Sequence, residues 1–321
     1  MKATEVLKPR AIGFLLCPGF SLMSFSSAIE PLRAANQLSE KALYTWSIFS
    51  PTGENLMTRH NLEMHVDAGL NEWPDGLDYL FTVAGSNAYT FTDRKVYRWL
   101  NAVAARKTVV GGISSGSYIL ANAGLLDGYR CTIHWDDMPA FVEAFPHLDT
   151  SYSLFEFDRD RITSSGGTSS MDMMLQLISD QHGAELAARI TTYFQHDRMR
   201  TSDDRQQRAE YQALARKSTK LAKAVVLMSN NIEEPIRPAD IARQIGLSQR
   251  QLERLFHNYC HCTPQKYYMK VRVQHSRNLL LETEMTVMEV ATATGFTTQS
   301  HFTKCFRDQF DVTPQRFRLQ H

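Results

Sequence analysis

The stretch Ile241-Ala242-Arg243-Gln244-Ile245-Gly246-Leu247-Ser248 recurs in altered form as Val290-Ala291-Thr292-Ala293-Thr294-Gly295-Phe296-Thr297. Each copy is followed by a mixed apolar and polar segment, and then by Thr-Pro-Gln at 263–265 and 313–315. A short helix, a turn that contains Gly and a capped second helix are typical of a helix-turn-helix. The chain from Pro238 to Phe317 therefore predicts two such units in tandem.

The second helix of each unit is predicted to be amphipathic. Apolar residues spaced i, i+3, i+4 and i+7 should face the core. In helix 249–259 these are Leu252, Leu255, Phe256 and Tyr259, and in helix 299–310 they are Phe302, Cys305, Phe306 and Phe310. Ser248 and Thr298 are the expected N-caps. The polar faces match pairwise, because 250, 253, 254 and 257 correspond to 300, 303, 304 and 307.

These polar faces are candidates for reading DNA, since a helix fits the major groove and Arg makes a bidentate contact with guanine. One charged helix would more simply be a solvated face, but two copies in matching register favour DNA. The candidate DNA-binding residues are Gln249, Arg250, Glu253, Arg254, His257, Gln299, Ser300, Thr303, Lys304 and Arg307. A single helix from Gln265 to about Thr283 should join the units and place both in successive major grooves, roughly 34 Å apart.

Residues 220–320 resemble the AraC/XylS family of bacterial transcription regulators. The resemblance is carried by Gly-Phe-Thr-Thr-Gln-Ser-His-Phe at 295–302 and Asp-Val-Thr-Pro-Gln-Arg-Phe at 311–317. It implies a seven-helix domain that binds double-stranded promoter DNA and usually activates transcription through RNA polymerase.

The charge is divided unevenly along the chain. Residues 1–216 hold 20 Lys and Arg against 25 Asp and Glu, whereas residues 217–321 hold 15 against 9. The basic part coincides with the tandem repeat, as neutralisation of DNA phosphates requires. The acidic part is therefore not expected to be a second DNA surface.

The cysteines point to no disulfide framework, because the chain has five of them, at 17, 131, 260, 262 and 305. Reduced thiols fit a cytoplasmic protein. Cys260-His261-Cys262 has no second ligand pair at zinc spacing, so neither a metal nor a cofactor is expected. The apolar run 11–17 is too short to span a bilayer, and no membrane association is expected.

The first part of the chain alternates predicted strands and helices. Strands are expected at 11–17, 44–50, 79–84 and 107–113, and helices at 24–38 and 93–106; residues 54–66 should form an irregular segment or hairpin. This alternation predicts an α/β domain with a parallel, flavodoxin-like sheet and helices on both faces. Ligands of such sheets bind beyond the carboxyl ends of the strands.

Later segments complete this domain. A short strand is predicted at 131–135, a hairpin at 155–163, and helices after Gly166-Gly167-Thr168 and at 183–195. The expected organisation is a ligand-sensing domain at 1–196, a charged linker at 197–217 and an all-α DNA-binding domain with two helix-turn-helix units at 218–321.

Gly112-Ile113-Ser114-Ser115-Gly116 matches the G-x-S-x-G nucleophile elbow. Residues 1–195 resemble the class I glutamine amidotransferase-like superfamily, in the branch fused to AraC-type domains. The resemblance is carried by Pro18–Phe20, Glu30–Asn36, this elbow, Ala123–Gly128, Thr132–Trp135 and Ser165–Thr168. Enzymes of the superfamily carry Cys at the elbow apex, where this chain has Ser114.

A serine at the apex needs a positioned base. The resemblance places only His134 nearby, and Asp136 and Asp137 are weak candidates for its acidic partner. We therefore interpret Ser114 and His134 as a degenerate site kept for binding, and expect no enzyme. The alternative is a DNA-tethered serine hydrolase or amidase that uses these two residues.

The same turns are candidates for binding an effector. N–H groups at helix N-termini favour anions, and helices should open after Ser114 and after Gly167. Aromatic rings can cover a cationic head, although core packing explains each of them equally well. The candidate ligand-binding residues are Phe20, Ser114, Ser115, His134, Trp135, Gly167 and Thr168. The resemblance implies a homodimer that senses a small nitrogenous metabolite such as a betaine, carnitine or an amino-acid derivative.

Overall fold

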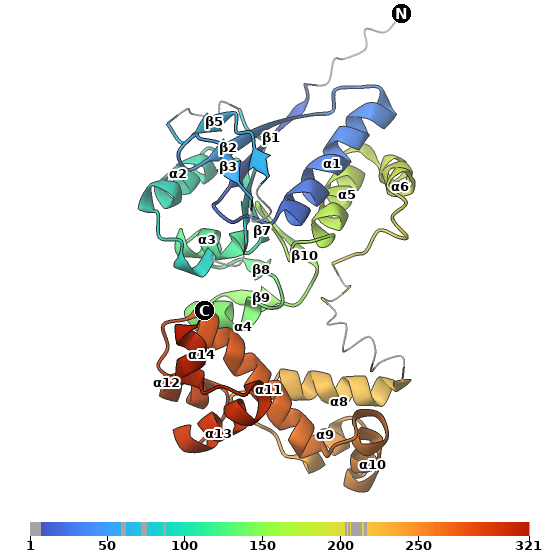
Figure 1. Ribbon diagram of the computed structural model, residues 1–321. Coiled ribbons are helices and arrows are strands. Elements are labelled where there is room, and N and C mark those ends of the chain that lie inside the picture. The colour runs from blue at the N-terminus through green and yellow to red at the C-terminus, as the bar shows by residue number, and fades with distance from the viewer. Residues whose placement is uncertain are drawn as a thin grey trace, which may run out of the picture. The chain divides into compact units, whose positions relative to one another are not determined.

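The computed structural model describes residues 8–58, 62–71, 76–85, 88–202, 204, 206, 214 and 217–320 of the 321-residue chain. The chain divides into two compact units, Met1–Gln206 and Gln207–His321 (Figure 1). The described residues 197–202, 204 and 206 of the predicted linker thus belong to the first unit.

The first unit is built on a seven-stranded sheet of order β10-β11-β7-β6-β1-β2-β5. The strands are β1 (Arg10–Leu16), β2 (Tyr44–Ser50), β5 (Ala68–Gly69), β6 (Tyr79–Ala84), β7 (Val109–Ser114), β10 (Phe155–Asp158) and β11 (Arg161–Ser164). Neighbouring strands pair in parallel except β10 with β11, which form the predicted hairpin. The prediction of a mostly parallel, flavodoxin-like sheet is confirmed.

Helices cover both faces of this sheet (Figure 1). They are α1 (Leu22–Ser39), α2 (Arg94–Ala104), α3 (Gly116–Asn122), α4 (Met138–Ala144), α5 (Ser169–His182) and α6 (Ala184–Tyr193), with a 3₁₀ turn at Ala88–Thr90. Successive side chains of a strand point to opposite faces. Phe14 accordingly packs in the core under α1 and α5, and Leu15 in the core under α2 and α3. Two covered faces explain why β1 is apolar at nearly every position.

Two segments depart from the expected sheet. The segment 54–66 contains a small antiparallel hairpin, β3 (Leu56–Met57) with β4 (Glu63–Met64). The strand predicted at 131–135 is wrong in its length, because β8 (Arg130–Thr132) ends early and pairs with β9 (Asp149–Ser151) in a separate sheet. The chain turns there because the N–H groups of Asp137 and Met138 both donate to the His134 carbonyl.

The second unit contains seven helices in its described part, the number implied by the AraC resemblance. They are α8 (Thr219–Ser229), α9 (Pro238–Gln244), α10 (Gln249–Cys260), α11 (Pro264–Glu282), α12 (Val287–Ala293), α13 (Gln299–Phe310) and α14 (Pro314–Leu319). Helix α11 contacts α8, α10, α12, α13 and α14, so one continuous helix joins both helix-turn-helix units. No helix in the described ranges is long and apolar enough to cross a membrane.

The turns of the repeat follow the predicted chemistry. The side chain of Ser248 accepts from the Gln251 N–H at the start of α10, and Thr298 accepts from the His301 N–H at the start of α13. Gly295 has φ +72°, and a Cβ at this position would lie 2.6 Å from the Ile232 carbonyl oxygen. Only glycine fits that turn.

The predicted core face of α10 is correct except at its end. Leu252 and Phe256 are fully buried, whereas Tyr259 is 37% exposed. The buried ring beside Phe256 is Tyr267 of α11, with ring centroids 5.2 Å apart. Because α11 fills this part of the core, the last turn of α10 is left at the surface.

Candidate functional site

The elbow predicted at Ser114 is present and strained. Strand β7 ends at Ser114, which has φ +58°, a conformation that is costly for a residue with a side chain. At Gly116 a Cβ would lie 2.0 Å from the Thr82 carbonyl oxygen, so no side chain fits. The sharp turn into α3 therefore depends on that glycine, and it holds Ser114 at the carboxyl end of the sheet.

Three loops meet at this elbow. Gly166, in the loop after β11, lies so close to Ser114 that a Cβ built on it would be 2.5 Å from the Ser114 Cβ. Ser115 Oγ donates to Asp137 Oδ2 at 2.5 Å, which ties the elbow to the loop after β8. The structure thus gathers the elbow with the loops that carry most of the candidate ligand-binding residues, namely Ser114, Ser115, His134, Trp135, Gly167 and Thr168.

The elbow lacks the proton relay of a serine hydrolase. In the described part of the chain no hydrogen bond joins Ser114 Oγ to His134, whose Nδ1 accepts from the Asp136 N–H at 3.3 Å. Burial raises the pKa of Asp137, and the hydrogen bond from Ser115 and the nearby His134 oppose this rise only in part. The acid beside His134 is therefore bonded to Ser115 and does not orient the imidazole as a catalytic triad requires.

Cys17 does not replace the missing apex thiol. It is 1% exposed, and burial raises its pKa, so it remains a neutral thiol in the core. A thiolate is the nucleophilic form of cysteine.

Some of the proposed ligand contacts have other partners. Phe20 is 2% exposed and packs edge-on against Phe25, at a centroid distance of 6.0 Å. The Gly167 N–H donates to Ser24 Oγ at 2.7 Å, so this amide is already engaged.

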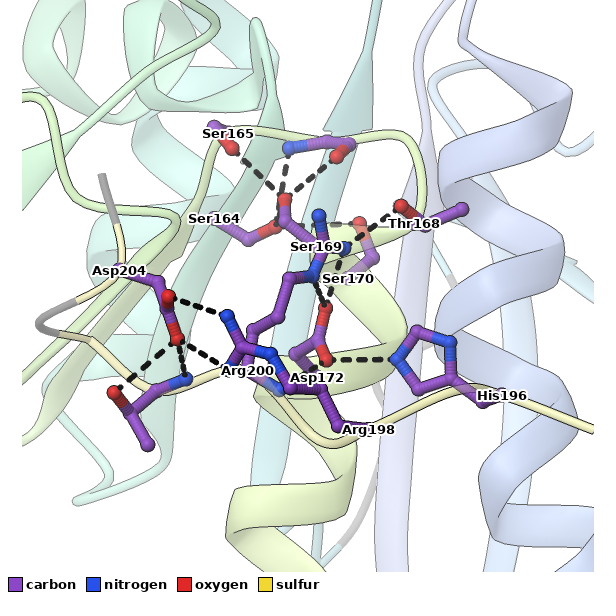
Figure 2. Close-up of polar contacts among 12 residues, drawn as sticks. Ser164, Ser165, Thr168, Ser169, Ser170, Asp172, His196, Arg198, Arg200 and Asp204 are labelled. Atoms are coloured by element: carbon purple, nitrogen blue, oxygen red, sulfur yellow. Dashed lines mark hydrogen bonds and ion pairs between the residues drawn. The ribbon is translucent and has the colours of Figure 1, made fainter. Parts of the chain in front are cut away.

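A buried carboxylate that the sequence pattern did not reveal lies in the helix that follows the loop of Gly166 and Thr168. Asp172, in the first turn of α5, is 0% exposed. It accepts from His196 Nε2 at 3.0 Å, from the Arg200 N–H at 2.8 Å, and from Arg200 Nε and Nη2 at 2.9 and 2.6 Å (Figure 2). Arg200 Nη2 also donates to Thr168 Oγ1 at 2.8 Å. The sequence feature that could have indicated this cluster is an acidic residue within an apolar helix, followed by cationic residues.

The candidate DNA-binding face of the second unit is exposed as predicted. Gln249, Arg250, Glu253, Arg254 and His257 of α10 are exposed, as are Gln299, Ser300, Lys304 and Arg307 of α13, and Thr303 is half-buried. Gln249 Nε2 donates to Glu253 Oε1 at 3.0 Å and holds that carboxylate in place. The face of α10 borders a groove of about 620 Å³ that also includes Cys262 and Thr263 before α11.

Comparisons with known proteins match both units. The DJ-1/PfpI family profile matches residues 10–180, and a helix-turn-helix domain profile matches residues 241–320. The HTH-type transcriptional regulator GbdR of Pseudomonas aeruginosa is 43% identical over 96% of this chain and 83% of that protein. The regulator CdhR of the same species is 37% identical over 95% of this chain and 90% of that protein.

A solved structure resembles part of the chain. It is that of an AraC family transcriptional regulator from Pseudomonas putida, with a TM-score of 0.53 and 28% sequence identity. The match covers 58% of this chain and 100% of the solved chain.

Proposed function

Because the chain belongs to the AraC-type helix-turn-helix transcription regulators that carry an N-terminal DJ-1/PfpI unit, we propose that it responds to a small zwitterion bound at the Ser114 elbow. The chain is a DNA-binding regulator, and its relatives place it among regulators and not among enzymes. The sensor corresponds to residues 1–196 and the DNA-binding domain to 218–321 in this proposal.

The observation that supports this effector most is the mixture of charges and rings around the elbow. Half-buried Trp135 lies in the same short loop as Asp136 and Asp137, and such a loop favours a cationic head by charge and by cation–π attraction. The Arg200 guanidinium, which is paired with Asp172, also contacts Thr168 on the neighbouring loop, where it can donate to a carboxylate. A betaine, a carnitine or an amino-acid derivative combines both groups.

The partners follow from the second unit. The exposed faces of α10 and α13 bind successive major grooves of promoter DNA in our proposal, and the regulator acts as a homodimer in the cytoplasm and recruits RNA polymerase. Both reading helices contact the same helix, α11, which supports their acting as one body. An effector must favour one of two states of the protein in order to change DNA binding.

A thermal-shift panel on the full chain tests the effector. The compounds are glycine betaine, carnitine, N-methyl glycines and basic amino acids. A ligand at about 100 times its dissociation constant stabilises the folded state by about 2.7 kcal/mol. We expect one class of compound to raise the melting temperature, and Trp135→Ala to weaken its binding by about tenfold, because the variant loses cation–π attraction.

The matched control is Trp46→Ala, which removes a half-buried Trp from β2 and should leave the ligand affinity unchanged. A compound that binds both variants equally well would place the effector away from the Trp135 loop. A panel in which no compound raises the melting temperature would contradict the zwitterion.

A further inference from the structure

The segment His196–Gln206, called the strap below, ends the first unit; its residues 196–202, 204 and 206 are described. Its first anchor is Asp172, whose carboxylate accepts hydrogen bonds from His196 and Arg200 (Figure 2). Every partner of this buried charge in the described ranges therefore lies on the strap.

A second anchor fixes the far end of the strap. The Gln206 N–H donates to the Tyr152 carbonyl at 2.7 Å, and its Nε2 donates to Thr132 Oγ1 and to the Ile133 carbonyl at 3.0 and 2.8 Å. The Asp204 carbonyl accepts from the Leu154 N–H at 3.2 Å. The strap is thus hydrogen-bonded along its length to the sensor.

An internal ion pair gives the strap its shape. Arg198 Nη2 and Asp204 Oδ1 are 2.7 Å apart, and the Thr201 N–H donates to the same carboxylate at 2.9 Å (Figure 2). These contacts hold the pKa of Asp204 at about 2, so the pair stays charged at neutral pH. The strap is a defined element and not an extended linker.

Each anchor touches one of the two loops that complete the elbow. Arg200 bonds to Thr168, which follows Gly166 and Gly167 in the loop after β11. Gln206 bonds to Ile133, which immediately precedes His134 in the loop after β8. Beyond Gln206 the chain passes into the second unit. If the distance between these two loops changes, the attachment points of the strap at Arg200 and Gln206 therefore move as well.

We propose that the strap carries the effector signal from the elbow to the DNA-binding unit and that Asp172 is its latch, an inference that rests on the proposed function. A buried carboxylate without partners is strongly unfavourable. In this proposal the strap has two states: latched on Asp172, as in the structure, or released with Asp172 hydrated. Such a two-state element is what coupling between two sites requires.

The test uses the full chain without any metabolite, together with a DNA duplex selected from a random-sequence pool by the wild-type protein. Arg200→Gln and Asp172→Asn release the latch. The control is Asp180→Asn, which neutralises an exposed carboxylate at the other end of α5. Hydrogen exchange of residues 196–206 should accelerate about tenfold in both latch variants and stay unchanged in the control.

The affinity for the selected DNA duplex shows whether release of the strap reaches the DNA-binding unit. Both latch variants should change the affinity for the selected duplex in the same direction by about fivefold or more. Faster hydrogen exchange of the strap together with a DNA affinity within about twofold of the wild type would overturn the proposal. Allosteric coupling typically changes an affinity by about fivefold or more. Unchanged hydrogen exchange of residues 196–206 in both variants would contradict the role of Asp172 as the latch.

Two features keep the outcomes separate. If Asp172→Asn does not fold, Arg200→Gln carries the test, because the Arg200 side chain is 29% exposed and its substitution keeps the hydrogen bonds from His196 and from the backbone N–H of residue 200 to Asp172. The comparison needs no effector, so a panel without any binding compound contradicts the zwitterion and leaves the strap measurable. An unchanged DNA affinity contradicts the strap and leaves the elbow site standing.

Discussion

The affinity of the full chain for its operator should fall by about 10³ to 10⁵ when the salt concentration rises from about 50 to about 200 mM. The second unit carries 15 Lys and Arg against 9 Asp and Glu between 217 and 321. We propose that its two helices enter successive major grooves, and a protein that makes about 6 to 10 phosphate contacts loses affinity on this scale because each contact releases condensed counterions. Fluorescence anisotropy across a salt series gives this slope directly.

Single substitutions test which residues contribute to the dependence of DNA affinity on salt concentration. Arg307→Ala on α13 should lower the slope by about 1 if this side chain contacts a phosphate. Arg98→Ala removes an exposed Arg from α2 in the acidic unit and should leave the slope unchanged. An affinity that is independent of salt would contradict the assignment of the second unit to DNA.

Gly116→Ala should destabilise the first unit by about 3 kcal/mol, because the added Cβ would overlap backbone that has no room to move. The overlap is with the Thr82 carbonyl oxygen on β6, 2.0 Å from the new atom. The expected fall in melting temperature is about 6 to 12 °C for a unit of this size. Differential scanning calorimetry of the full chain measures it.

Gly128→Ala is the matched control for this substitution. Gly128 has φ +73° and no heavy atom within 4 Å of a built Cβ, so its cost comes from backbone conformation alone. That cost is about 1 kcal/mol. Equal losses in the two variants would mean that the elbow tolerates a side chain at 116, contrary to the close approach of β6.

The sequence predicted those features that depend on local periodicity. The apolar run 11–17 implied a strand covered on both faces, and Phe14 and Leu15 do pack in opposite cores. The tandem glycines and the caps Ser248 and Thr298 located both reading helices. The exposed Tyr259 shows the limit of this reasoning, since spacing alone does not reveal that Tyr267 fills the space beside Phe256.

The site depends on contacts between residues far apart in the chain, which periodicity does not report. Asp172 meets Arg200 across 28 positions and Ser115 meets Asp137 across 22. The charges of the strap suggested a solvated linker, because the spacing of charges does not reveal that Arg200 pairs with a buried carboxylate in a helix and Arg198 with Asp204 of the strap itself. The loops around Ser114 were located by motif, and their mutual contacts required the fold.

We propose that α10 and α13 read two separate parts of one operator. The most direct test is to measure the base preferences of the wild type, Arg254→Ala and Lys304→Ala on a randomised operator library. Each substitution should cost about 1 to 3 kcal/mol and relax the preference at its own base pair. The two relaxed positions should lie about 10 base pairs apart, one turn of DNA. Wild-type preferences in both variants, or relaxation of the same base pair by both, would contradict this account.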